Sequence, residues 1–128
     1  MSDQKMILVV EDQVELAEMF SQMLQISGFR VLHCRISQMA LDYIENEKPD
    51  AIILDLMMPD FSGLEILKAV REREDMRGLP VIIVSAKSMP NEIKEGLDAG
   101  ANAYLVKPVS FSELYEELKK VLKMGEEV

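Results

Sequence analysis

Three acidic residues in this sequence stand where they could bind a metal ion and react as a nucleophile. Glu11 and Asp12 directly follow the apolar run 6–10, and Asp55 directly follows the apolar run 51–54. If these runs are neighbouring parallel strands, the three carboxylates meet at one edge of a sheet. Like charges about 4 Å apart repel by roughly 4 kcal/mol at an effective dielectric near 20, so the pKa of one acid rises unless a cation intervenes. The cluster therefore predicts a hard-metal site with a reactive carboxylate.

Five apolar runs, rich in β-branched residues, alternate with amphipathic segments and predict the elements that position these acids. The runs are 6–10, 31–34, 51–54, 81–84 and 103–106, and each gap leaves room for one helix and two short loops. Such alternation indicates a parallel sheet covered on both faces. With right-handed crossovers, it predicts an α/β fold of the flavodoxin-like type, a doubly wound (βα)5 three-layer sandwich with strand order 2-1-3-4-5.

Two helices carry clear signals. The first is predicted to bury one face, formed by Leu16, Phe20, Met23 and Leu24. Near the C-terminus, Ser110 and Glu113 have the spacing of a capping box in front of an amphipathic segment that starts at residue 111.

Composition limits the class of protein. The 128 residues predict a single domain over 1–128, and the net charge of −9 argues against direct nucleic-acid binding by this chain. The single cysteine, Cys34, excludes an intramolecular disulfide. The first apolar run is too short for a signal peptide or a membrane span, which predicts a cytoplasmic protein that does not bind membranes.

Two further polar residues end the fourth and fifth runs. Ser85 lies in VSAK and Lys107 in AYLVKP. Three carboxylates, a hydroxyl and an ammonium suit phosphoryl transfer onto a carboxylate. A magnesium ion held by the acids would neutralise phosphoryl oxygens, and Asp55 could attack to form an acyl phosphate. Lys107 would pair with one phosphoryl oxygen, and Ser85 would donate a hydrogen bond to another.

Four motifs together resemble the receiver domain of bacterial two-component response regulators. They are VVEDQ (9–13), DLMMPDFSGLEIL (55–67), VSAK (84–87) and AYLVKP (103–108), in the right order and at suitable spacing. The resemblance implies a stand-alone signalling module similar to chemotaxis regulators, one that catalyses its own phosphorylation and slow dephosphorylation. It implies that Asp55 is the phosphoacceptor, phosphorylated by a histidine kinase or phosphotransfer protein.

The resemblance also assigns the residues around the acceptor. Glu11 and Asp12 would bind Mg2+ directly or through water, and the backbone carbonyl of Met57 would be a further ligand. A cis peptide bond is expected between Lys107 and Pro108.

Ser85 and Tyr104 take the two switch positions of the family. In the switch that this implies, Ser85 moves to bond the phosphoryl group and Tyr104 fills the vacated space. The surface formed by the fourth helix, fifth strand and fifth helix then changes shape and binds an output protein that the sequence does not identify. The resting state is expected to be a monomer, and dimerisation on phosphorylation is left open. Met57 and Lys87 position no hydrolytic water, which predicts slow self-dephosphorylation.

Other interpretations stay open. The chain could be the receiver excised from a longer DNA-binding or enzymatic response regulator. A magnesium-dependent phosphatase is disfavoured because Met57 stands two residues after the nucleophile, where such enzymes commonly have a second acid. A flavin-binding electron carrier is disfavoured because the first loop reads EDQVE and the chain has no tryptophan. Asp12 could also simply cap the first helix.

Overall fold

Strands and helices alternate in this computed structural model, which describes residues 4–60 and 62–124. The strands are β1 (Met6–Val10), β2 (Arg30–Cys34), β3 (Ala51–Leu54), β4 (Val81–Ser85) and β5 (Ala103–Val106). The helices are α1 (Val14–Ile26), α2 (Ala40–Glu47), α3 (Gly63–Glu72), α4 (Pro90–Asp98) and α5 (Phe111–Leu122), and a 3-10 helix, η1 (Ser37–Met39), precedes α2. The two ends of the predicted domain 1–128 lie outside the described residues.

The strands form one parallel sheet in the order β2-β1-β3-β4-β5, which confirms the predicted topology. Two strand bounds differ from the prediction. β2 begins at Arg30 and β4 includes Ser85, which pairs with Val106 of β5. Both added residues are polar, and backbone pairing does not depend on side-chain polarity. Apolar runs therefore locate the strands but not their exact ends.

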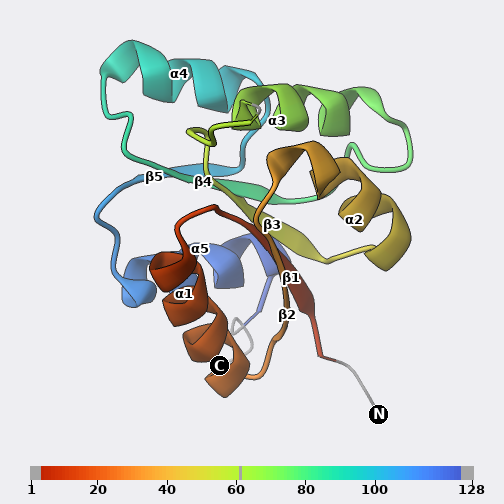
Figure 1. The fold of residues 1–128 in the computed structure, drawn as a ribbon, viewed down its shortest axis with the longest axis vertical. Helices are drawn as coiled ribbons and strands as arrows, with labels where there is room; N and C mark the ends of the chain where they lie inside the picture. Colours follow the sequence, from red (N-terminus) through yellow and green to blue (C-terminus); the bar gives the residue numbers. More distant parts are fainter. Residues whose placement is uncertain (1–3, 61, 125–128) are drawn as a thin grey trace.

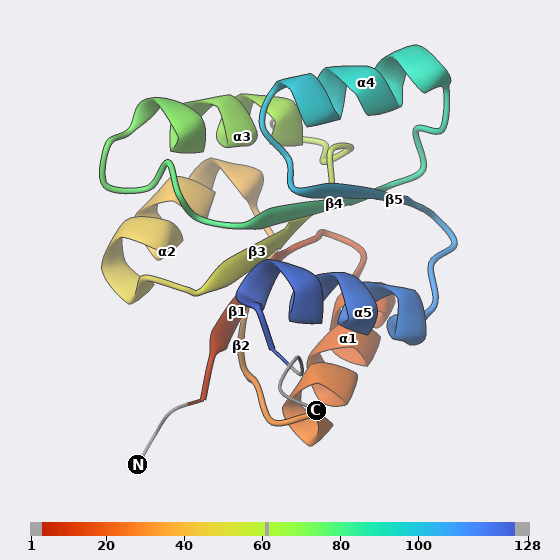
Figure 2. The same ribbon diagram turned by 180° about the vertical axis from the view of Figure 1, so that it is seen from behind.

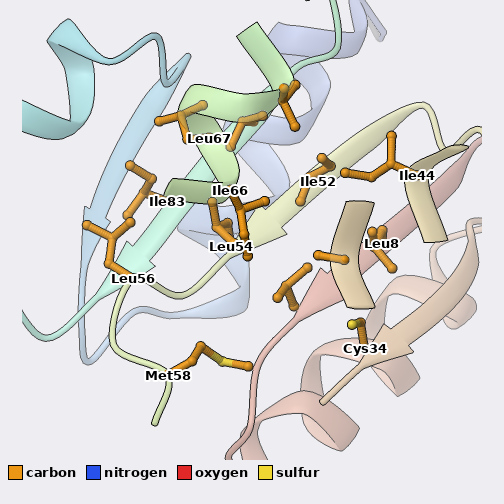
Figure 3. Close-up of a cluster of buried hydrophobic side chains, with 14 of the residues drawn as sticks. Leu8, Cys34, Ile44, Ile52, Leu54, Leu56, Met58, Ile66, Leu67 and Ile83 are labelled. Atoms are coloured by element: carbon orange, nitrogen blue, oxygen red, sulfur yellow. The ribbon is translucent and has the colours of Figure 1, made fainter. Parts of the chain in front are cut away.

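Helices cover both faces of the sheet, as Figures 1 and 2 show: α1 and α5 lie on one side, and α2, α3 and α4 on the other. Side chains alternate between the faces along each strand. Ile7 and Val9 of β1 belong to the cluster under α1 and α5, whereas Leu8 and Val10 belong to the opposite cluster. Figure 3 shows this second cluster, where Ile66 packs among strand residues. Because both faces are buried, the strands read as continuous apolar runs.

The strand register aligns the carboxyl ends of the central strands. Val10 of β1 is paired with Leu54 of β3, and the Asp55 N–H donates to the Val10 carbonyl at 3.0 Å. On the other side, the Lys107 N–H donates to the Ser85 carbonyl at 2.8 Å. The residues that follow the strands are therefore held side by side by backbone pairing.

The buried face of α1 is rotated from its predicted position. Ala17, Phe20 and Leu24 are buried, whereas Met23 is 40% exposed. At 3.6 residues per turn, Met23 lies about 60° to one side of Phe20, and Ala17 and Leu24 lie on the other side. The prediction weighed side-chain hydrophobicity and overlooked Ala17, whose small side chain lets the helix approach the sheet.

Helix ends agree with their sequence signals. Gly28 and Gly100 have φ values of 101° and 114°, in the left-handed region that favours glycine. The capping box before α5 is present, because the Glu113 N–H donates to Ser110 Oγ at 3.1 Å and the Ser110 N–H donates to Glu113 Oε1 at 3.0 Å.

We predict that Gly63→Ala lowers the free energy of unfolding by about 1–3 kcal/mol, because overpacking forces the backbone to shift. A Cβ at Gly63 would lie 2.5 Å from the Asp55 carbonyl oxygen and 2.9 Å from Leu56 Cα. Urea denaturation measures the change. The matched control is Gly78→Ala, whose Cβ would meet no atom within 4 Å, with an expected effect within about 0.5 kcal/mol. Equal stability of the two variants would contradict the prediction.

Candidate functional site

The three predicted acids lie together at the carboxyl ends of β1 and β3. Glu11, Asp12 and Asp55 each offer an oxygen atom, and these atoms all lie within 4.8 Å of one another. Glu11 and Asp55 are buried, each 3% exposed, whereas Asp12 is half-buried. The site therefore consists of two enclosed carboxylates and one that faces the opening.

Lys107 is the cation that faces this cluster. Its Nζ lies 3.1 Å from Glu11 Oε1 and 3.3 Å from Asp55 Oδ2, and it also donates to Gln13 Oε1 at 3.1 Å. The expected cis peptide bond between Lys107 and Pro108 is present. A single ammonium thus bridges the acids that follow two neighbouring strands.

Burial and charge together disfavour ionisation of Glu11. The pKa of the Glu11 carboxyl is raised from its ordinary 4.5 to about 6, chiefly by burial and second by the charge of the nearby Asp55 carboxylate. The Gln13 N–H, which donates to Glu11 Oε2 at 3.1 Å, and the Lys107 ammonium act in the opposite direction. The sequence predicted a raised pKa from repulsion between acids, but burial is the larger cause.

A pocket of about 230 Å³ opens onto the cluster. It is lined by Asp12, Gln13, Asp55, Met57, Ala86 and Lys107. Carboxylate oxygens are the ligands that Mg2+ and Ca2+ prefer, and Mg2+ commonly uses one or two of them together with water and phosphate oxygens. The acidic donor set therefore fits a hard divalent cation, and the pocket leaves space for its further ligands.

The loop after β3 is anchored by alternating side chains. Leu56 and Met58 are buried in the cluster that Figure 3 shows, whereas the Met57 side chain is 52% exposed. The Met57 N–H donates to Asp55 Oδ1 at 3.0 Å. The backbone of Met57 therefore lies beside the Asp55 carboxylate, while its side chain is largely exposed.

Ser85 and Tyr104 hold the same residue of the loop between β4 and α4. Ser85 is fully buried, and its Oγ accepts from the Lys87 N–H at 3.1 Å. The half-buried Tyr104 donates its hydroxyl to the Lys87 carbonyl at 2.8 Å. Both predicted switch residues therefore contact the loop that borders the site.

The capping interpretation of Asp12 fails. The N-cap residue of α1 is Gln13, and no side-chain cap hydrogen bond is present there. The Asp12 carboxylate instead belongs to the acidic cluster.

Two contacts that hold the surrounding loops were not predicted from the sequence. Asp60 accepts from the Ser37 N–H and Oγ and from the Gln38 N–H, at 3.3, 2.9 and 3.1 Å, and so joins the β3–α3 loop to η1. His33 has its Nε2 2.7 Å from the Glu11 carbonyl oxygen. Both contacts link residues 22 or 23 positions apart, and no local pattern signals them.

Fold and acidic pocket together define a flavodoxin-like α/β protein with an acidic cluster at the carboxyl ends of its strands. The family model for the response regulator receiver domain matches residues 7–119. The chain therefore belongs to the response regulator receiver domain family, whose members are signalling modules of two-component systems.

Curated relatives and solved structures agree with this family. The phosphate regulon transcriptional regulatory protein PhoB of Pseudomonas aeruginosa is 36% identical over 119 residues, which cover 93% of this chain and 52% of PhoB. The response regulator MprA of Mycobacterium avium is 37% identical over 117 residues, 91% of this chain and 50% of MprA. The chain thus spans about half the length of the curated relatives it matches.

Two solved structures share the fold at about full length. A CheY-like receiver domain protein from Methanospirillum hungatei has a TM-score of 0.87 and 30% identity, and the match covers 94% of this chain and 95% of that one. The chemotaxis protein CheY4 of Vibrio cholerae has a TM-score of 0.86 and 30% identity, and the match covers 92% of this chain and 98% of that one.

Within the residues that the structure describes, no helix has both the length and the hydrophobicity needed to cross a bilayer.

We predict that the metal-free protein loses stability as the pH rises from about 4.5 to about 6. A carboxyl whose pKa is raised on folding binds more protons in the folded state over this window, so stability falls with increasing pH. The shift of Glu11 corresponds to a loss of about 2 kcal/mol above pH 6. Urea denaturation at several pH values with EDTA measures it. The Glu11→Gln variant should lack this decline, and an identical decline in both proteins would assign it to another group.

Proposed function

We propose that Asp55 accepts a phosphoryl group from a histidine kinase or a phosphotransfer protein, with Mg2+ bound by the acidic cluster. The observation that carries this proposal is the convergence of Asp55, the acidic pair Glu11 and Asp12, and Lys107 on one pocket. Family membership supports it, because receiver domains act in two-component signalling. Asp12, Glu11, Asp55 and the Met57 carbonyl are the proposed ligands of the ion.

The transfer exchanges one bond to phosphorus for another. An Asp55 carboxylate oxygen attacks the phosphorus of the donor phosphohistidine, a P–O bond forms, and the P–N bond breaks. The leaving imidazole keeps the bonding electron pair and takes a proton from solvent. When bound, Mg2+ would neutralise charge on the phosphoryl oxygens.

Lys107 and Ser85 are the proposed ligands of the phosphoryl group itself. Lys107 already lies 3.3 Å from Asp55 Oδ2, so its ammonium can follow the charge as it moves onto the phosphoryl oxygens. Ser85 is buried at the end of β4 and would donate its hydroxyl to another oxygen. If the Ser85 side chain moves to bond the phosphoryl group, its hydrogen bond with the Lys87 N–H changes. Tyr104 is hydrogen-bonded to the carbonyl of the same residue. These shared contacts are the proposed route from the acceptor to an output surface on α4, β5 and α5.

The partners follow from the same proposal. The chain functions as one receiver domain, residues 1–128, in the cytoplasm, where its kinase donates the phosphoryl group. Its output is binding of another protein, or of an effector domain in a longer regulator, as the half-length match to PhoB and MprA favours. We propose a monomeric resting state.

We predict that Asp55→Ala abolishes phosphorylation by acetyl phosphate with Mg2+, because it removes the attacking oxygen. The gain of one phosphoryl group, measured by intact mass, should occur in the wild type, and EDTA should prevent it. The matched control is Asp98→Asn, which changes an exposed acid paired with Lys94 on α4 and should leave labelling intact. Labelling of a folded Asp55→Ala protein would show that the acceptor is misassigned.

We predict slow self-dephosphorylation, with a half-life of minutes or more in the presence of Mg2+. The exposed Met57 side chain carries no group that orients a water molecule toward the phosphoryl group. Met57→Asn should shorten the half-life, since an amide can hold a water there. Met19→Asn, an exposed substitution on α1, is the control and should leave decay unchanged. Decay of the wild type within seconds would contradict the prediction.

A further inference from the structure

His33 is the only histidine of the chain and lies on β2, the edge strand next to β1. It is paired with Val9 of β1, and Val9 belongs to the core cluster under α1 and α5. Paired residues of parallel strands point to the same face of the sheet. The imidazole therefore leans over β1 on the α1 side, close to the loop that carries Glu11 and Asp12.

The imidazole contacts the backbone between the two acids. His33 Nε2 lies 2.7 Å from the Glu11 carbonyl oxygen. A carbonyl oxygen only accepts hydrogen bonds, so this contact requires a proton on Nε2. The carbonyl belongs to the planar peptide unit that joins Glu11 to Asp12. Its orientation sets the direction in which the Asp12 side chain leaves the backbone.

Every polar group of Glu11 has a partner. Its N–H donates to the Cys34 carbonyl at 3.1 Å, and its carbonyl accepts from His33. Its carboxylate accepts from Lys107 at 3.1 Å and from the Gln13 N–H at 3.1 Å. β2 thus holds the backbone of Glu11 on both sides, through Cys34 and through His33. The half-buried Asp12 follows directly and depends on this orientation.

We propose that His33 is a positioning residue for the metal-binding acids. Its Nε2–H fixes the peptide between Glu11 and Asp12 and so directs the Asp12 carboxylate into the pocket it shares with Asp55. If His33 only filled space, any aromatic ring of similar size would serve. The 2.7 Å contact with the Glu11 carbonyl oxygen, however, uses the N–H group of the imidazole. The inference rests on the proposed Mg2+ site and adds to it a residue outside the acidic cluster. Partners of this kind commonly tune a metal site through its ligands.

The test compares Mg2+ affinity in the full chain without any phosphodonor. NMR titration of the Asp12 and Gln13 amide signals with MgCl2, at about pH 8 where an imidazole is ordinarily neutral, gives the dissociation constant. His33→Phe keeps a ring and removes the donor, and we expect its affinity to fall about tenfold. His33→Gln keeps an N–H donor and should recover most of the affinity.

Val31→Ala is the matched control for packing. Val31 lies on the same strand and the same face as His33, beside Ile7 at the far end from the acids. The Val31→Ala substitution should remove apolar contacts in the core cluster under α1 and α5 and leave Mg2+ affinity unchanged. Equal weakening in Val31→Ala and His33→Phe would overturn the inference, as would unchanged affinity in His33→Phe or no recovery in His33→Gln.

Two outcomes separate this inference from the proposed function. Absence of Mg2+ binding by the wild type would refute the metal site itself. Normal binding by the wild type and by His33→Phe would refute only the role of His33. A further readout needs no variant: the imidazole nitrogen shifts of the single histidine should show the proton on Nε2. A proton on Nδ1 alone would overturn the inference even if His33→Phe failed to fold.

Discussion

The contact of Lys107 with two buried carboxylates is the interaction on which the site depends. Three ionised acids and one ammonium leave an excess of two negative charges in a pocket where Glu11 and Asp55 are almost fully buried. Burial is the main cause of the raised pKa of Glu11, and the negative charge of Asp55 is the second. Lys107 offsets this only in part. A divalent cation would supply the positive charge that balances the two excess negative charges. Without it, the buried acids lower the stability of the fold, so metal binding is the better explanation of the cluster.

The sheet determines where these charges meet. Glu11 and Asp55 follow paired residues of β1 and β3, and the Asp55 N–H continues the ladder to the Val10 carbonyl. Leu56 and Met58 then enter the core and fix the direction of the loop. The close approach of Gly63 to the Asp55 carbonyl brings the start of α3 directly against it. The geometry around Asp55 is thus fixed mainly by backbone pairing and apolar packing rather than by charge.

The convergence of the acids could be predicted from the sequence, whereas the contacts that hold the loops depend on the exact alignment of neighbouring strands and loops. Apolar runs followed by Glu11, Asp12 and Asp55 indicate strand ends, and parallel topology then brings the ends together. The contacts of His33 and Asp60 could not be predicted, because each joins a side chain to backbone groups more than twenty residues away. A shift of one residue in strand pairing would remove the His33 contact without changing any sequence pattern. The rotated face of α1 has a different cause, since Ala17 contributes little hydrophobicity but permits close packing.

The loops on the two sides of the pocket are held in different ways, and this difference gives the proposed switch a direction. On the β1 side, the Glu11 backbone is hydrogen-bonded to β2 through the Cys34 carbonyl and His33, neither of which is a proposed ligand of the phosphoryl group. On the β4 side, Lys87 is held by Ser85 Oγ and the Tyr104 hydroxyl, and Ser85 is itself a proposed phosphoryl ligand.

The Tyr104 ring also lies against α4. A Cβ at Gly96 of that helix would come within 2.9 Å of the ring, so the helix backbone and the ring are in close contact there. A phosphoryl group that draws on Ser85 would therefore compete with the hydrogen bond that Ser85 makes to Lys87 on the β4 side. Movement of Tyr104 would disturb α4, whereas the hydrogen bonds from β2 to the Glu11 backbone involve neither Ser85 nor Tyr104. In the proposed switch, the response is therefore directed toward α4 and β5.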